Sequence, residues 1–149
     1  MHPNMKPSEQ VALVGAVDPD NYSANPYSTP WVDMSKFDRA LAVVMVGTME
    51  SSSTVNAKIE QATTDGGTPK DVTGKAIAAL TQAGTDSDKQ AVINLKADDL
   101  DVDNGYRFAR LTVTVAAAAS DMAALMLGFN PRHAPASDHD AATVDEIVG

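Results

Sequence analysis

The stretch STVNAKIEQATT, residues 53–64, alternates apolar and polar side chains with the period of two of a β-strand. Its apolar residues Val55, Ala57 and Ile59 fall on one face, and the polar residues between them fall on the other. This pattern predicts a strand with one side in the core and one side in solvent. The turn formers that follow, DGGTPKD, end the strand.

Short segments of similar character recur on both sides of this strand. Residues 72–84 are ambiguous, because their alanines favour a helix while Val72, Ile77 and Thr81 favour a strand; the neighbouring strands decide for a strand. The other expected strands are residues 11–17, 40–48, 89–97, 106–118 and 122–129. Turns separate the segments at intervals of roughly ten to fifteen residues, as in sandwiches and small barrels. We therefore predict an all-β fold, an antiparallel β-sandwich built as a jelly roll of seven or eight strands.

The chain has 149 residues, which is the size of one domain with a core of its own. Residues 1–10 are polar and contain prolines, so we expect an extended N-terminal arm. The sandwich domain is expected over residues 11–130, with residues 18–30 as a long loop rich in turn formers. Residues 131–149 are expected to form an extended C-terminal tail whose end is weakly amphipathic.

The composition of the chain argues against several kinds of binding partner and reaction. The formal net charge of −9 disfavours binding to DNA or RNA, whose phosphates would be repelled. The sequence contains no cysteine, which excludes disulfides, thiolate nucleophiles and thiolate metal ligands. Residues 1–10 lack the apolar core of a signal peptide, and no apolar run is long enough to cross a bilayer. We expect synthesis in a cytoplasm and no membrane contact.

The acidic stretch ADDLDVDNGY, residues 97–106, is the strongest candidate for a metal site. Aspartates at positions 99, 101 and 103 match the first, third and fifth positions of an EF-hand loop. The sixth position should be glycine and is Asn104, and the twelfth should be a bidentate glutamate and is Arg110. Asn-Gly after Asp is also typical of a type I′ hairpin turn. We predict a turn, and leave open a looser calcium site at 98–103 shared with another subunit.

No arrangement of residues indicates an enzyme. The pair His133 and His139 lies in the polar tail, six positions apart, and lacks the third ligand that a zinc site would need. The sequence contains neither a nucleophile elbow nor a phosphate loop. A glycosidase carboxylate pair is defined by separation in space, which a sequence does not give, but aromatics at 5% argue against a sugar-stacking cleft. We predict no catalytic residue, no cofactor and no metal.

Two expected strands carry more apolar surface than one sandwich core uses. Residues 40–48 and 122–129 are apolar at both parities, so both faces of each strand would be buried. A homo-oligomer would cover the second face; alternatively, the 18–30 loop packs over it. The candidate assembly contacts are Trp31, Val44, Val46, Phe129, Val144 and Ile147.

Three segments carry a resemblance to known proteins: WVDMSKFDRALAVVMVGTM, GTDSDKQAVINLKADDLDVDNGYRFARLTVTVA and LGFNPRHAPASDHDAATVDEIV. In these segments, which cover more than half of the chain, the sequence resembles small virion proteins encoded beside the major capsid protein in tailed bacteriophages and prophages. The resemblance implies a structural role as a head decoration or cement protein on the capsid surface, bound to the major capsid protein and often trimeric. It supplies no set of functional residues.

Two other functions fit a small β-sandwich of this composition. One is a trimeric receptor- or carbohydrate-binding knob of a head or tail fibre, which would be present in few copies where a decoration protein is present in many. The other is a small hydrolase, which would need a pocket with convergent carboxylates or histidines.

Overall fold

The computed structural model describes residues 3–137 and 143–149. One helical turn, α1 (Pro7–Gln10), precedes the strands. The strands are β1 (Val11–Tyr22), β2 (Pro26–Ser28), β3 (Val32–Asp33), β4 (Phe37–Met49), β5 (Thr54–Ala62), β6 (Lys70–Ala76), β7 (Leu80–Thr81), β8 (Gln90–Lys96), β9 (Phe108–Ala116) and β10 (Ser120–Pro131). Two short 3₁₀ turns, Ala97–Asp99 and Val102–Asn104, lie between β8 and β9.

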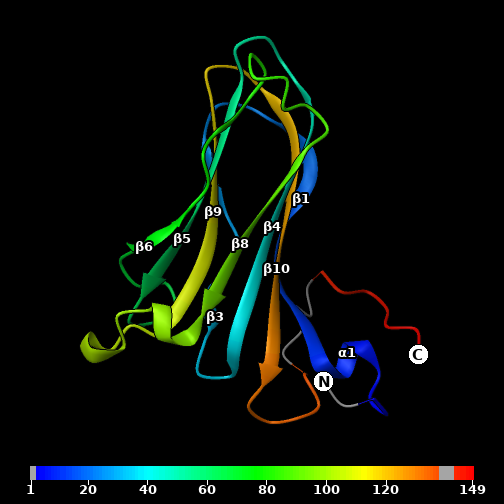
Figure 1. The fold of residues 1–149 in the computed structure, drawn as a ribbon, viewed down its shortest axis with the longest axis vertical. Helices are drawn as coiled ribbons and strands as arrows, with labels where there is room; N and C mark the ends of the chain where they lie inside the picture. The colour runs from blue at the N-terminus through cyan, green and yellow to red at the C-terminus, as the bar shows by residue number, and fades with distance from the viewer. Residues whose placement is uncertain (1–2, 138–142) are drawn as a thin grey trace.

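The strands form two antiparallel sheets that pack face to face (Figure 1). Sheet I has the order β1-β10-β4-β8, and sheet II has the order β2-β9-β5-β6, with the two-residue strands β3 and β7 beside β9 and β5. The pairs β1–β10, β2–β9, β4–β8 and β5–β6 are nested inside one another along the chain. A long hairpin folded over on itself produces this nesting, and it is the topology of a jelly roll. The predicted antiparallel jelly-roll sandwich is confirmed.

The core lies between the sheets and consists mainly of small and β-branched side chains. In sheet II the predicted alternation of β5 holds, since Val55, Ala57 and Ile59 are all at most 1% exposed. Phe37 is the largest fully buried side chain, and its ring lies against Gly128 of β10. A Cβ on Gly128 would lie 2.7 Å from Phe37 Cδ1, so this position has room for glycine only.

The acidic stretch forms a corner between the two sheets. Strand β8 belongs to sheet I and β9 to sheet II, so the two strands that flank the corner do not pair with each other. The predicted type I′ hairpin is therefore wrong, although the segment does turn the chain. Asn104 lies in a 3₁₀ turn, and only Gly105 takes the left-handed conformation, with φ of 79°. Glycine adopts this conformation without the steric cost that a Cβ would add.

The two ends of the described sandwich differ from their expected form. Strand β1 continues through the turn formers to Tyr22, with an irregular register between Val17 and Asp20, and β2 pairs with β9 inside the expected 18–30 loop. In the N-terminal segment, α1 packs beside β1 and β10. Residues 143–149 lie next to α1 at the same corner of the molecule (Figure 1). The division into arm, sandwich and tail remains a prediction.

None of the helices among the described residues is long and apolar enough to span a membrane.

Candidate assembly surface

The outer face of sheet I is apolar, although it faces away from the core. On the central strand β4, the inward positions are Ala42, Val44 and Val46, each at most 4% exposed. The alternate positions Leu41 and Val43 are partly exposed and point outward. Over this part of β4, every second residue therefore packs in the core, and the equally apolar residues between them lie on the outer surface of the sheet.

The register carries this apolar parity across β4, β10 and β1, while on β8 only Val92 of the outward residues is apolar. Val43 lies opposite Leu125 of β10 and Val92 of β8, and Leu125 lies opposite Ala16 of β1. We call Ala16, Leu125, Val43 and Val92 the centre row. The next row on one side contains Leu13, Leu127, Leu41 and Asn94, and the next on the other side contains Ala123, Met45 and Gln90. Together these rows form the apolar face.

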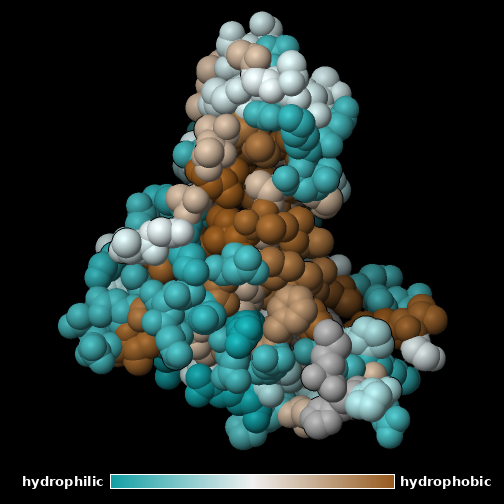
Figure 2. All heavy atoms as spheres, in the orientation of Figure 1, coloured by the Kyte–Doolittle hydropathy of each residue, from teal (hydrophilic) through white to brown (hydrophobic). Residues whose placement is uncertain are grey.

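Two apolar residues of the face are exposed, and the others are partly exposed. Met45 is 38% exposed and Val92 is 57% exposed. Figure 2 shows hydrophobic atoms gathered over the region of β8, β4 and β10 and bordered by hydrophilic ones. A contiguous patch of this kind is typical of an interaction site, while single exposed apolar residues are normal. Of the expected 18–30 loop, β2 lies in sheet II, whereas Pro19, Asp20 and Asn21 border the face at a hollow that they share with Met45 and Ala123.

The outer face of sheet II has the opposite character. Glu60 of β5 lies there with only 7% exposure. Its Oε2 accepts hydrogen bonds from Nε of Arg110 at 2.8 Å and from the hydroxyl of Thr112 at 2.9 Å, and its Oε1 lies 3.2 Å from Nζ of Lys58. The Thr112 hydroxyl also lies 2.8 Å from Ser28 Oγ, which ties β2 to β9. This network stabilises sheet II and leaves its face polar.

The pKa of Glu60 records the strength of this network. Burial alone would raise the pKa of the carboxyl group, but the hydrogen bonds from Arg110, Thr112 and Lys58 outweigh burial and lower the pKa below its ordinary value. The group is therefore a carboxylate at neutral pH. A general acid would need the opposite shift.

The candidate contacts taken from the sequence are scattered over the molecule. Phe129 is partly exposed at one end of the apolar face, next to Arg39 of β4. Trp31 lies elsewhere, with the Arg110 guanidinium 4.6 Å from the centre of its ring. Ile147 is 52% exposed in the C-terminal segment, where Val144 is partly buried. The structure does not bring these residues together on one surface.

The prediction that Val44 and Val46 are assembly contacts places them on the wrong face of β4. They are 0% and 4% exposed and pack in the core, so they are not available for contact on the surface of this monomer. The outward residues of the same strand are Leu41, Val43 and Met45. Both parities of β4 are equally apolar, so the sequence carried no signal for which of them faces outward. The outward leucines of β10 were missed for the same reason.

Two of the four aspartates of the acidic corner form ion pairs with lysines of β6. Nζ of Lys75 lies 2.8 Å from Oδ2 of Asp99, and Nζ of Lys70 lies 2.7 Å from Oδ2 of Asp101. The hydrogen bond from Lys70, with a further one from Asn104, lowers the pKa of Asp101. For Asp99, burial would raise the pKa, but bonds from Lys75 and the Lys96 amide outweigh it. Among the described residues no cluster of His, Asp and Glu side chains could hold a metal ion.

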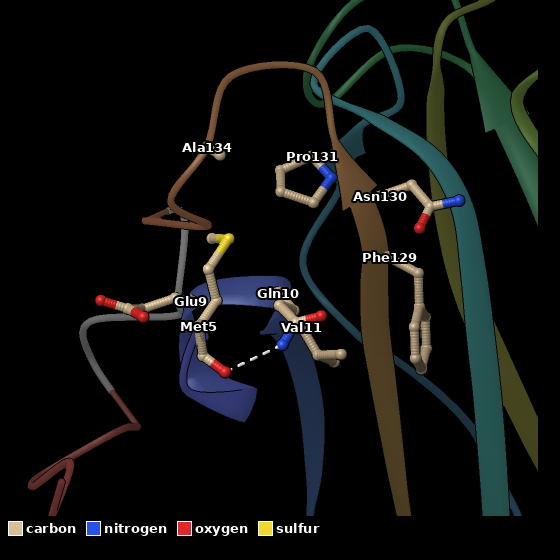
Figure 3. Close-up of a pocket in the computed structure, with 8 residues that line it drawn as sticks. All are labelled: Met5, Glu9, Gln10, Val11, Phe129, Asn130, Pro131 and Ala134. Carbon is tan, nitrogen blue, oxygen red and sulfur yellow. Dashed lines mark hydrogen bonds between the residues drawn. The ribbon is translucent and has the colours of Figure 1, made fainter. Parts of the chain in front are cut away.

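A small hollow lies between α1 and the end of β10 (Figure 3). It measures about 230 Å³ and is lined by Met5, Glu9, Gln10, Val11, Phe129, Asn130, Pro131 and Ala134. Gln10 Nε2 donates a hydrogen bond of 3.0 Å to the Met5 carbonyl, and Oε2 of Glu9 accepts one of 2.7 Å from the Lys6 amide. Glu9 is the only carboxylate in the lining, so the hollow has no pair of groups for acid–base chemistry. Of the histidine pair in the tail, His133 is exposed and His139 lies outside the described residues.

Comparison with known proteins gives matches to solved structures only. No family model and no curated protein matches the chain. A broad bean stain virus structure is similar with a TM-score of 0.43 and 9% identity over 90% of this chain and 91% of that one. A Triatoma virus structure has a TM-score of 0.44 and 11% identity over 87% and 69%. An infectious bursal disease virus structure has a TM-score of 0.45 and 11% identity over 91% and 37%. At this level we take neither a family nor a function from them.

Proposed function

We propose that this chain is a structural protein of a virus particle, a decoration or cement protein that binds the outside of a phage head and stabilises contacts between capsid subunits. The observation that carries the proposal is the apolar outer face of sheet I on an otherwise self-sufficient jelly roll. A protein that worked alone would not keep such a face exposed, because it would promote association.

The distribution of charged groups supports a structural role. The best-connected charged groups, Glu60 with Arg110 and Asp101 with Lys70, bind strands and corners together. A rigid β-fold with surface contacts and without a reaction centre is what a cement protein needs. The resemblance of the sequence to small virion proteins points to the same class.

The proposed partner is the major capsid protein, and the proposed place is the capsid surface. The N-terminal segment and the residues after β10 lie at one corner of the sandwich, where the Ala136 amide donates a hydrogen bond of 2.7 Å to the Glu9 carbonyl. Segments at one corner can reach across a joint between capsid subunits together. Their contact area would be gained at the cost of ordering the chain.

The test is to mix the purified full-length chain with phage heads assembled without it. Sedimentation of the heads should carry the chain with them in many copies, and the decorated heads should withstand heating better than bare ones. A matched mixture containing an unrelated jelly-roll protein is the control. Failure to sediment with heads would contradict the proposal, and a stoichiometry of only a few copies per particle would favour the fibre knob.

A further inference from the structure

One end of the apolar face carries two cations. Arg39 of β4 and Lys96 of β8 lie directly opposite each other in the register, and both are exposed. Like charges in opposed positions destabilise an antiparallel pair of strands. Among the described residues neither side chain lies within salt-bridge distance of a carboxylate, although the Lys96 charge contributes to the lowered pKa of Asp99. We call these two residues the basic end of the face.

The other end of the face is acidic. Asp121 of β10 stands beside Gly47 of β4, since a Cβ built on Gly47 would lie 3.1 Å from Asp121 Cβ. On the other side of Gly47, the amide of Asp88 donates a hydrogen bond of 3.1 Å to the Gly47 carbonyl. Asp121, whose Oδ1 accepts a hydrogen bond of 2.7 Å from Asn21 Nδ2, and Asp88 form the acidic end of the face, on either side of Gly47.

The two ends are equally far from the centre row. On β4, Arg39 and Gly47 each lie four residues from Val43. The same spacing of four separates Val92 from Lys96 and from Asp88 along the chain that includes β8. The centre row therefore divides the face into a basic half and an acidic half of equal length. Such a surface is complementary to itself when it is turned end over end.

We propose that the apolar face binds the same face of a second copy of this chain, about a two-fold axis that crosses the strands along the centre row. The axis lies between the two faces, so each residue of the centre row meets its own counterpart. Leu41 then faces Met45 of the second copy. Arg39 and Lys96 face the acidic end of the second copy, where the Asp121 side chain lies over Gly47. In an isologous contact each of these pairs occurs twice.

The size of the face suits such a contact. Four strands spaced about 4.8 Å apart and eight residue steps of about 3.3 Å give a flat footprint of roughly 500 Å², which side-chain relief enlarges. Stable interfaces bury about 800 Å² on each partner. Two sheets that pack face to face lie about 10 Å apart with their strands within about 30° of each other. The contact therefore repeats between copies the packing that sheets I and II make within one copy.

This inference goes beyond the proposed function and does not rest on it. Both use the apolar face of sheet I, but here a second copy covers that face, and the paired chains would then reach a phage head through their terminal segments. The two-fold contact gives a dimer, where the resemblance of the sequence led us to expect a trimer.

The first test is the mass of the full chain in solution, measured by light scattering during gel filtration. We expect twice the chain mass of 15.6 kDa. Leu125→Asp, which places a charge on the centre row, should yield a folded monomer, with circular dichroism as the check on folding. Thr114→Asp, at a partly exposed outward position of β9 in sheet II, is the matched control and should stay dimeric. A wild-type chain that is monomeric or trimeric would overturn the inference.

The second test uses charge exchange, which depends on the end-over-end geometry. Arg39→Glu alone and Asp121→Arg alone should each weaken pairing about tenfold, because each variant opposes like charges at both ends of its own dimer. Mixing the two single variants should restore pairing, since the introduced carboxylate at position 39 then lies one strand away from the introduced guanidinium at position 121 of the other copy, and the two wild-type residues lie in the same relation. The double variant on one chain should also pair. If the mixture pairs no better than either variant alone, the two-fold contact is wrong, and a capsid subunit becomes the better occupant of the face.

Discussion

Arg110 Nε donates a 2.8 Å hydrogen bond to Oε2 of Glu60, on the outer face of the sheet that carries no apolar patch. The same carboxylate accepts a hydrogen bond from the Thr112 hydroxyl and forms an ion pair with Lys58. Both oxygens of this almost fully buried carboxylate therefore have partners. The jelly roll thus has one outer face fixed by an ion-pair network within the chain and one outer face, on sheet I, left to apolar side chains.

Glu60→Gln tests this network through pH. At neutral pH the variant should lose about 1–3 kcal/mol of unfolding free energy, because Arg110 loses its charged partner. The folded-state pKa of Glu60 is below its ordinary value of 4.5, so its contribution is present above that value and is lost as pH falls through the folded pKa. The deficit of the variant should therefore shrink below about pH 4.5 in urea titrations. The exposed Glu50→Gln is the control, and a deficit independent of pH would contradict the assignment.

Two buried serines should respond in opposite ways to replacement by alanine. Both Ser53 and Ser120 are 0% exposed, but Ser53 Oγ has no hydrogen-bond partner among the described residues, whereas Ser120 Oγ donates to the Asp121 carbonyl at 3.2 Å. Ser53→Ala should raise the unfolding free energy by up to about 1 kcal/mol, and Ser120→Ala should lower it by a similar amount. Urea unfolding measures both. Loss of stability in Ser53→Ala would mean that its hydroxyl is bonded.

Calcium should not affect stability through the acidic corner. Lys70 and Lys75 already neutralise Asp101 and Asp99, and a cation would have to displace them. The melting temperature should be the same with millimolar calcium as with a chelator. If calcium instead raises the melting temperature of the wild-type chain but not that of Asp101→Asn, the shared surface site that the sequence left open is established.

The terminal segments should matter for binding to heads, if the proposed function holds. A chain that lacks residues 1–10 and 138–149 should bind phage heads more weakly than the full chain. Because α1 packs beside β1 and β10, the melting temperature of the shortened chain is the necessary control. Equal affinity of the two chains for heads would show that these segments do not bind the capsid.

The sequence predicts the elements well and their orientation poorly. Alternation in residues 53–64 placed the core side of β5 correctly, because its two parities differ in polarity. On β4 the residues of both faces are apolar, so the sequence does not distinguish Val43, which lies on the outer surface, from Val44, which lies in the core. The Asn104-Gly105 pair marked a turn but not its kind, since the partners of β8 and β9 lie far away in the chain. The charged ends of the face were not predicted, because they depend on the register of three strands.

The most direct test of assembly through the apolar face is cross-linking at its centre. The chain contains no cysteine, so a single introduced one reports on one position. With Val43→Cys on the two-fold axis, the two thiols face each other across sheets about 10 Å apart, too far for a direct disulfide but within reach of a short bis-maleimide cross-linker. Treatment with this cross-linker should convert most of the protein to a covalent dimer, while Thr114→Cys on sheet II should stay monomeric on a denaturing gel. If Val43→Cys cross-links no more than Thr114→Cys, the apolar face does not join copies of this chain.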